Sequence, residues 1–464
     1  MKRTKIVATI GPATAEQATI KALVAAGANA FRINLSHGNP EQWAKLIDNI
    51  HASAPDAPII IDTEGPEVRI INVPKPIELK AGQKFTFSNA VHAHSPHATH
   101  ALHFTPGQTV LLDDGAMRLV VEHIEGNNIT CLIQTDGILT DRRKLTVPSD
   151  VIDLPVLSES DVTNIMFCLG RGADAIALSF TQRAEDVATC RQIVGDGIMI
   201  IAKIENQSGV NEAEHIIKAA DAVMIARGDL GVEIPLEDVP AVQKRLVRVA
   251  NTLGKPVIVA TQMLESMTTS PQPTRAEVSD VANAILDGAD AVMLSGETAR
   301  GKYPVQTVET MARIAVATDK LAVASFKRDS QGKISTAEAI SAAVYDLAES
   351  LHANAIISAT TSGFTARMVA RFRPHVPVIA VAHDERTKRL LQLSWGVIPC
   401  VFPRESSSAH QTIPDALRAA VDAGYVQPDD LIIATAGVNT RKHGSTNLIE
   451  VHHVRELITF HEGR

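Results

Sequence analysis

One pattern recurs along this chain and restricts its fold more than any other feature. It is a short, largely apolar run, then a polar turn, then a stretch with helical spacing. Such short apolar runs are typical of strands in a parallel sheet that is buried on both faces. The eight runs are Ile6–Thr9, Ala30–Asn34, Ile59–Asp62, Ala175–Ser179, Ile198–Lys203, Ala222–Ala226, Pro256–Ala260 and Ala291–Leu294. Eight β/α units predict a TIM (β/α)8 barrel, and a doubly wound open sheet is the alternative at this level.

The segments between the runs carry signals for the start and the end of helices. Residues 274–277 read Thr-Arg-Ala-Glu, which is the S/T-x-x-E pattern of a capping box. Gly27, Gly170 and Gly288 close three of the helical stretches, as glycines often do.

Two segments break the rhythm and predict two further domains. Between residues 71 and 147, alternating stretches are separated by turns such as Asp113-Asp114-Gly115, which predicts a small inserted β domain. Beyond about residue 327 a new α/β pattern predicts a C-terminal domain with a parallel sheet. The predicted division is 1–70 and 149–328 for the barrel, 71–148 for the inserted domain and 329–464 for the C-terminal domain.

Composition excludes several classes of protein. With 44 Lys+Arg against 52 Asp+Glu, the net charge of −8 argues against a general binder of nucleic acid or anionic membranes. The four cysteines form no CxxC pair, so neither a zinc site nor a disulfide framework is predicted. No apolar run approaches the roughly 20 residues needed to cross a bilayer. The stretch Ile6–Ile10 is too short for a signal-peptide core, so we expect a cytoplasmic protein.

The expected strands end in polar and charged residues, and in a TIM barrel these ends form the active site. Lys203 and Glu205 are two apart and therefore share one face of a strand. The other polar ends are Arg32-Ile33-Asn34-Leu35-Ser36, Asp62-Thr63, Arg227-Gly228-Asp229, Thr261-Gln262 and Ser295-Gly296-Glu297. Each end alone has a structural explanation, such as a surface salt bridge. Six of them in one chain would be costly to desolvate without a function.

The residue types at these ends indicate a site for anions and cations. Glu205 and Asp229 supply the hard oxygens that suit Mg²⁺. Positive charge for a transferring phosphoryl group comes from Arg32, Arg69 and Lys203. Gly228 lets backbone N–H groups approach an anion at a helix start. The oxygens suited to a monovalent cation are those of Asn34, Ser36, Asp62 and Thr63. The substrates are therefore expected to be phosphates or carboxylates.

Longer motifs, spread over nearly the whole chain, point to one family. They are Thr4–Pro12, Arg32–Gly38, Asp62–Arg69, Lys203–Asn206, Ala226–Glu233, Ala260–Met267, Pro273–Glu277, Asp280–Asn283, Leu286–Asp290, Met293–Thr298 and Gly444–Asn447. These stretches resemble pyruvate kinase, most specifically around Arg227 and Thr261 and least in the inserted domain.

The resemblance implies a function and an architecture. It implies transfer of the phosphoryl group of phosphoenolpyruvate to ADP, giving pyruvate and ATP, the last step of glycolysis. It implies Mg²⁺ (or Mn²⁺) and K⁺ as cofactors, and a homotetramer. The inserted domain would be a β-barrel lid that closes over the site and excludes water, and the C-terminal α/β domain would be regulatory.

The resemblance also assigns roles to individual residues. The implied Mg²⁺ ligands are Glu205 and Asp229, and the implied K⁺ ligands are Asn34, Ser36, Asp62 and Thr63. The implied catalytic residues are Lys203, Arg32, Thr261, Ser295 and Glu297. Lys203 would neutralise the phosphoryl group, Thr261 would lie near the protonated enolate, and Ser295 and Glu297 match a proton-relay region. The implied substrate contacts are Arg32, Lys203, Gly228, Asp229 and Thr261, and the implied nucleotide contacts are Pro12, Asn34, His37, Arg69 and either Arg143 or Lys144.

Three departures from the family pattern stand out. Glu64 replaces the lysine of Asp-Thr-Lys-Gly-Pro-Glu, although Glu67 matches the K⁺-dependent type. The lid segment Arg-Lys-Gly-Val-Asn-Leu-Pro is here Arg-Arg-Lys-Leu-Thr-Val-Pro, residues 142–148, so the nucleotide cation is Arg143 or, with a slip, Lys144. A histidine tract, His92, His94, His97, His100 and His103, is expected to be a solvated loop rather than a metal site.

A loop in the C-terminal domain predicts an effector site. Residues 360–366 open a helix after an expected strand, which is a phosphate cradle. The loop resembles the family's effector loop, where sugar phosphates or AMP bind, and the residues implied are Thr360, Ser362, Gly363 and Thr365. Arg441 and Lys442 would add positive charge.

Two other functions compete with this interpretation. A metal-dependent aldolase or lyase would share the Lys203, Glu205 and Asp229 site, but the inserted domain and the C-terminal domain argue against it. A catalytically silent metabolite sensor would have lost one of those three residues, and none is lost.

Overall fold

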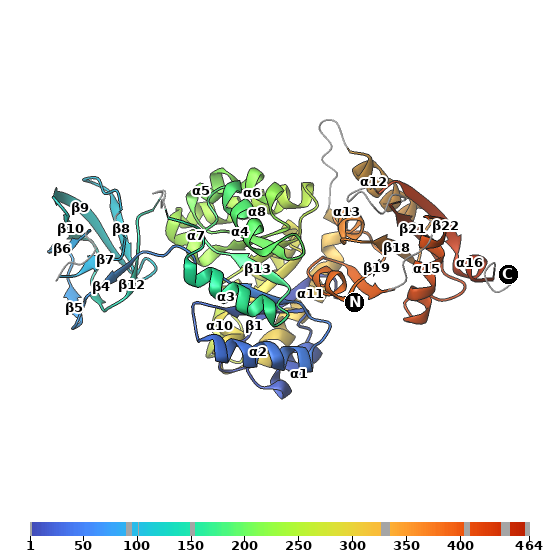
Figure 1. Cartoon of the computed structure of the whole chain (residues 1–464), viewed down its shortest axis with the longest axis horizontal. Helices are drawn as coiled ribbons and strands as arrows, with labels where there is room; N and C mark the ends of the chain where they lie inside the picture. Colours follow the sequence, from blue (N-terminus) through green and yellow to red (C-terminus); the bar gives the residue numbers. More distant parts are fainter. Residues whose placement is uncertain are drawn as a thin grey trace.

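The computed structural model describes residues 2–89, 95–100, 102–148, 154–325, 335–402, 409–437 and 446–459. The three predicted parts lie along the longest axis, with the small β domain and the C-terminal domain at opposite ends and the large barrel between them (Figure 1). The exact domain boundaries, predicted after residues 70, 148 and 328, stay predictions.

Eight parallel strands close the central barrel in the order β1-β17-β16-β15-β14-β13-β3-β2. They are β1 (Lys5–Thr9), β2 (Ala30–Asn34), β3 (Ile59–Asp62), β13 (Ala175–Leu178), β14 (Met199–Ile204), β15 (Ala222–Ala226), β16 (Val257–Ala260) and β17 (Ala291–Leu294). Because β1 pairs with both β2 and β17, the sheet is closed. The predicted TIM barrel is therefore confirmed, and the open doubly wound sheet is wrong.

Helices surround this barrel and begin and end where the local signals predicted. They are α1 (Gln17–Ala26), α2 (Pro40–Ser53), α3 (Glu159–Gly170), α4 (Ala184–Val194), α5 (Gln207–Asn211), α6 (Ala213–Ala219), α7 (Arg227–Glu233), α8 (Val239–Thr252), α9 (Arg275–Asp287), α10 (Gly296–Ala299) and α11 (Pro304–Ser325). Thr274 and Glu277 form the expected capping box of α9. Gly27 and Gly288 end α1 and α9 in the left-handed conformation, with φ of 118° and 108°.

The inserted segment forms a second, smaller closed barrel, β10-β6-β7-β4-β12-β8-β9, with the separate pair β11-β5 beside it. Its strands are β4 (Arg69–Ile71), β5 (Ile77–Leu79), β6 (Lys84–Ser88), β7 (His97–Ala98), β8 (Thr109–Leu112), β9 (Met117–Glu125), β10 (Asn128–Ile133), β11 (Gly137–Leu139) and β12 (Arg143–Thr146). It has its own core, which includes Phe85, Phe87 and Phe104. A separate core lets this domain move as a unit relative to the barrel.

The C-terminal domain contains a five-stranded sheet in the order β20-β19-β18-β21-β22, in which β22 is antiparallel to β21. Its elements are α12 (Thr336–Ser350), β18 (Ala355–Thr360), α13 (Phe364–Ala370), β19 (Val378–Ala382), α14 (Glu385–Leu391), β20 (Val397–Val401), α15 (Ala409–Asp422), β21 (Leu431–Ala436), β22 (Leu448–His453) and α16 (Val454–Thr459). The sequence did not predict the antiparallel edge strand β22.

The C-terminal domain seals the N-terminal end of the large barrel. Leu393, fully buried, belongs to the core inside the barrel together with Val7, Ile60 and Met199. Polar contacts surround this plug: Arg389 pairs with Asp174 at 2.7 Å, and the Trp395 backbone N–H donates to the Asp290 carboxylate at 3.0 Å. The barrel and the C-terminal domain therefore share one packed interface.

Lys5 lies buried at this interface, which gives a first prediction. Burial lowers its pKa to about 8, although Asp319 and Asp290 oppose the shift. The folded state loses this proton near pH 8 while the unfolded chain keeps it until about pH 10.5, so stability rises with pH in that window. The rise in the free energy of unfolding is on the order of 3 kcal/mol.

We expect Lys5→Met to raise the unfolding temperature at pH 7 and to flatten this rise in stability with pH. Calorimetry from pH 7 to 10.5 measures both effects, with the exposed Lys21→Met as the control. An unchanged pH curve in Lys5→Met would contradict the prediction.

Candidate active site

Two buried cations share one carboxylate at the C-terminal ends of the barrel strands. Asp62, at the end of β3, accepts from Arg32 Nε at 2.5 Å and from Lys203 Nζ at 3.0 Å. Only 1% of the Asp62 surface is exposed. Burial opposes its ionisation, but Arg32 and Lys203 outweigh burial and hold the pKa of Asp62 below its ordinary value. The strand ends thus bring together residues that are 30 and 141 positions apart.

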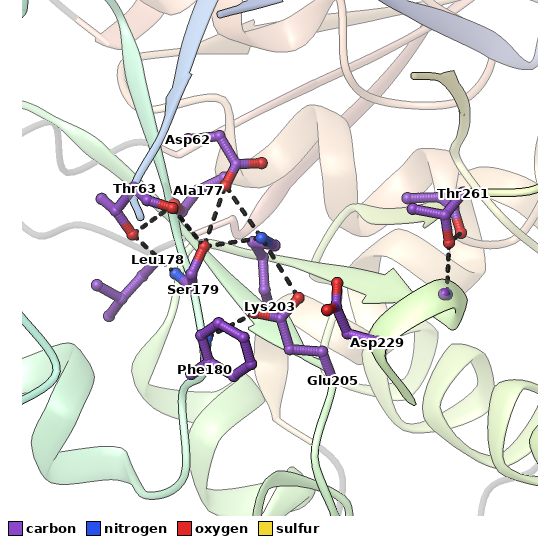
Figure 2. Close-up of polar contacts among 12 residues, drawn as sticks. Asp62, Thr63, Ala177, Leu178, Ser179, Phe180, Lys203, Glu205, Asp229 and Thr261 are labelled. Atoms are coloured by element: carbon purple, nitrogen blue, oxygen red, sulfur yellow. Dashed lines mark hydrogen bonds and ion pairs between the residues drawn. The ribbon is translucent and has the colours of Figure 1, made fainter. Parts of the chain in front are cut away.

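Lys203 is held by partners on three neighbouring strand ends (Figure 2). Besides Asp62, its Nζ donates to Ser179 Oγ at 2.7 Å and lies 3.3 Å from Glu205 Oε2. Burial lowers the pKa of Lys203, but the two carboxylates outweigh burial and raise it above its ordinary value. The ammonium group is therefore charged and fixed in place.

Ser179 and Phe180 were missed by the sequence reasoning. Ser179 Oγ donates to the Thr63 carbonyl at 2.7 Å, and the Phe180 backbone N–H donates to Glu205 Oε1 at 2.7 Å. Phe180 has a positive φ of 52°, which is uncommon for a bulky residue. The available signal was the polar residue Ser179 at the end of the fourth apolar run, which received no role.

Glu205 and Asp229 form the carboxylate pair predicted for Mg²⁺. Glu205 is fully buried, and its pKa is raised to about 7 by burial, with the Asp229 charge adding to the shift. Its Oε2 accepts no hydrogen bond from the described residues, although Lys203 lies nearby. A divalent cation would relieve the repulsion between the two carboxylates and would use that oxygen. The donor set therefore fits Mg²⁺, which takes few protein carboxylates and keeps other sites for substrate oxygens.

Gly228 and Thr261 adjoin this pair. The Gly228 N–H, in the first turn of α7, donates to Thr261 Oγ1 at 2.7 Å. Thr261 and Gln262 have φ of 68° and 54°, and a β-branched residue with positive φ is a strained conformation. Such strain gathers at functional sites. The structure thus brings Thr261 and Gly228 together, and their substrate-binding role stays a prediction.

Ser295 and Glu297 lie at the end of β17. Glu297 is fully buried and accepts from the backbone N–H groups of Ser295 at 2.7 Å and of Leu264 at 3.1 Å. Burial raises the pKa of Glu297. Ser295 Oγ is buried without a hydrogen-bond partner among the described residues. Glu297 therefore fixes two strand-end loops, and the proton relay stays a prediction.

The residues predicted to hold K⁺ lie on the neighbouring ends of β2 and β3. Asn34 and Asp62 are direct partners in the sheet, and Asn34 Oδ1 accepts from the Ser36 N–H at 3.1 Å. Thr63 is buried and Ser36 is exposed. All four residues offer oxygens, which fits an alkali cation.

The predicted nucleotide residues fall into two groups, one that follows the barrel strands β1 and β2 and one on the lid strands β4 and β12. Pro12 and His37 are exposed at the ends of β1 and β2. Arg69 pairs with Glu67 and donates to the Arg142 carbonyl at 3.0 Å.

Of the two lid cations, Arg143 is exposed and pairs with Asp113 of the lid at 2.7 Å. Lys144 instead reaches the barrel, where its Nζ lies 2.7 Å from Asp229 Oδ1. Burial lowers the pKa of Lys144, but Asp229 and Glu67 outweigh burial and raise it, so the group stays charged.

The predicted effector loop lies between β18 and α13. Thr360 and Thr365 are buried and Ser362 is exposed, while Gly363 has φ of 77°. Thr365 Oγ1 and Thr446 Oγ1 lie 2.7 Å apart. Arg441 and Lys442 lie outside the described residues.

The histidine tract shows no metal centre where it is described. His92 and His94 lie outside the described residues. His97 is buried in β7 beside the Ser95 carbonyl, so the prediction of a solvated loop is wrong at this residue. Within the ranges that the structure describes, no three His, Cys, Asp or Glu side chains gather as a metal site. Among those same ranges, no helix is long and apolar enough to cross a membrane.

Fold and site together define a TIM-barrel enzyme whose strand ends carry a fixed lysine beside a carboxylate pair. Comparison with known proteins agrees with this class. A family model for the pyruvate kinase barrel domain matches residues 1–308, and one for the pyruvate kinase alpha/beta domain matches residues 338–452. The chain belongs to the pyruvate kinase family, a family of transferases.

Individual relatives cover the chain from end to end. It is 41% identical to a pyruvate kinase of Clostridium acetobutylicum over 471 residues, which is 97% of this chain and 99% of the relative. It is 41% identical to one of Geobacillus stearothermophilus, over 100% of this chain and 82% of the relative. The crystal structure of a pyruvate kinase from Cryptosporidium parvum superposes with a TM-score of 0.88 at 34% identity, over 98% and 96% of the two chains.

Proposed function

We propose that the chain transfers the phosphoryl group of phosphoenolpyruvate to ADP, giving pyruvate and ATP. The observation that carries this proposal is the Lys203 ammonium, buried between Asp62 and Glu205 at the mouth of the barrel. A fixed positive charge in a site of low dielectric stabilises negative charge that develops on a transferring phosphoryl group.

The other residues of the site have separate roles around Lys203. Arg32, oriented by Asp62 and by Thr9 Oγ1 at 3.2 Å, lies beside the phosphoryl path. Gly228 and Thr261 bind the carboxylate of the substrate, and Thr261 lies where the enolate carbon takes its proton. Mg²⁺ or Mn²⁺, held by Glu205 and Asp229, would supply charge neutralisation for the phosphoryl oxygens. The small β-barrel is a lid that closes from the β3–β13 side and excludes water.

Pyruvate formation tests this function. The assay couples pyruvate to NADH loss through lactate dehydrogenase, with Mg²⁺ and K⁺ present, and is run with and without ADP. Pyruvate that depends on ADP supports the kinase. An aldolase or lyase does not remove the phosphoryl group of phosphoenolpyruvate and would form no pyruvate here with or without ADP. Folded protein that makes no pyruvate even with sugar phosphates or AMP would contradict the proposal.

We expect activation by K⁺ through Asn34, Ser36, Asp62 and Thr63. The support is the set of oxygens at the paired ends of β2 and β3, together with Glu67 of the K⁺-dependent pattern. Replacing K⁺ by tetramethylammonium at constant ionic strength should lower the rate about tenfold, which corresponds to 1.4 kcal/mol of transition-state stabilisation. Equal rates in the two salts would contradict the expected activation by K⁺.

We also expect allosteric activation by a phosphorylated metabolite at the loop of residues 360–365. Gly363 is the sensitive position, because an added Cβ would lie 2.7 Å from Arg367 Nη1 and 2.9 Å from Leu391 Cδ2. A sugar phosphate or AMP should shift the phosphoenolpyruvate saturation curve by about 5- to 150-fold. Gly363→Val should remove the shift. No shift with any of these compounds in the wild-type protein would defeat the expectation.

The quaternary structure and the compartment rest on the family resemblance. We propose a homotetramer in the cytoplasm. Light scattering at micromolar concentration gives the mass directly, and a monomeric mass would contradict the first part.

A further inference from the structure

A single lysine of the lid bridges the lid and the barrel. Lys144, on β12, places its Nζ 2.7 Å from Asp229 Oδ1 on α7 and 3.5 Å from Glu67 Oε1 on the connection between β3 and β4. Asp114 Oδ1, on the lid turn after β8, lies 3.9 Å away. The ammonium also stands over the Phe180 ring, 4.7 Å from its centroid. Only 13% of the side chain is exposed, so these groups replace most of its water.

The lid touches the same helix at a second point. A Cβ on Gly115 would lie 4.0 Å from the two methyl groups of Val232, which is one turn from Asp229 on α7. The lid turn therefore rests on α7, and Lys144 supplies the charged part of that contact. Figure 2 shows Glu205 below Lys203 and Asp229, on α7, to the right of Lys203.

The partner of Lys144 is one of the two carboxylates proposed for the divalent cation. A divalent cation that takes the Asp229 oxygen nearest Lys144 would compete with the ammonium, which lies at hydrogen-bond distance from it. An ammonium and a divalent cation at adjoining positions also repel each other. Lys144 moreover occupies the position of the glycine in the family lid pattern, where no side chain would reach Asp229.

We propose that the ion pair between Lys144 and Asp229 holds the lid on the barrel, and we call this ion pair the latch. A divalent cation must displace the Lys144 ammonium to bind Asp229. Metal binding then frees the ammonium from Asp229 and releases the lid turn from α7. Lys144 thus sets both how tightly the site takes its metal and how the lid responds to it. The inference rests on the proposed function, because that function identifies Asp229 as a metal ligand.

Binding of Mn²⁺ alone, without substrate or nucleotide, tests the latch. Electron paramagnetic resonance gives the free Mn²⁺, and Lys144→Met should bind the ion about three- to tenfold more tightly than the wild-type chain. Lys144→Arg, which keeps the charge, should stay within about twofold. Lys84→Met removes an exposed lysine on the same lid and serves as the matched control, with unchanged affinity. Asp229→Asn should bind weakly, and adding Lys144→Met to it should give no tightening.

Hydrogen exchange supplies the second readout. In the wild-type chain, Mn²⁺ should speed exchange of the lid turn 113–116, whereas in Lys144→Met exchange should already be fast without metal. Unchanged or weaker Mn²⁺ binding in Lys144→Met, in protein that is shown to be folded, would overturn the latch. These measurements need no turnover. Failure of the proposed function appears instead as wild-type protein that binds Mn²⁺ but forms no ADP-dependent pyruvate.

Discussion

Lys203→Met should lower kcat of the phosphoryl transfer by about 10³-fold or more, with a much smaller change in the KM for phosphoenolpyruvate. Methionine keeps the length and the apolar stem of lysine but carries no charge. The lost charge acts mainly where negative charge develops, so the effect falls on kcat rather than on substrate binding. Steady-state kinetics with the lactate dehydrogenase coupling measures both constants.

A second lysine of the barrel, which is partly buried, provides the control. Lys255 precedes β16 and donates to the Ala220 carbonyl at the opposite end of the barrel. Lys255→Met should keep most of the wild-type rate. Comparable loss in both variants would mean that lysine removal damages the barrel in general, and near-normal kcat in folded Lys203→Met would reject the assigned role.

Asp62→Asn should destabilise the barrel by about 3–5 kcal/mol, because Arg32 and Lys203 are then buried without their shared carboxylate. For a domain of this size the unfolding temperature should fall by roughly 10 °C. Differential scanning calorimetry measures the fall. Activity should fall with it, since Asp62 holds both cations in place.

A double-mutant cycle separates this charge effect from simple loss of packing. In the Lys203→Met background one of the two stranded cations is already absent, so Asp62→Asn should cost less there than in the wild-type chain. Asp174→Asn is the control. Asp174 is also fully buried, but it pairs with Arg389 at the N-terminal end of the barrel, away from the C-terminal strand ends that carry the site. It should lower stability and leave kcat largely intact. Additive costs for Asp62 and Lys203 would show that the contact between their side chains carries no coupling.

The large barrel could be predicted because its information is local. Each buried parallel strand is a short apolar run, and each helix carries its own caps, so the eight runs and the Thr274 capping box identify themselves. The edge strand β22, with the sequence Leu-Ile-Glu-Val-His-His, is half-buried and lacks that pattern, so its pairing with β21 was missed.

The site was predictable in part, for a related reason. The C-terminal ends of barrel strands meet at one face, so the sequence alone predicts that Lys203, Glu205, Asp229 and Asp62 lie together. It does not show that Ser179 orients Lys203 or that Lys144 reaches across from another domain, because such contacts depend on how two elements pack. Strand register decides which of Arg143 and Lys144 faces the barrel, and composition does not encode that register.

The place of Leu393 inside the barrel affects whether the C-terminal domain of this chain can be removed or exchanged. Chains with three cores usually tolerate the loss or exchange of a terminal domain, since each core is complete. Here the interior of the barrel is completed by a residue that is 68 positions beyond the end of α11. A shortened chain that ends after α11 would open that interior to water and leave Asp174 and Asp290 without their partners Arg389 and Trp395. A C-terminal domain exchanged into this chain would therefore have to supply a side chain that fills the position of Leu393.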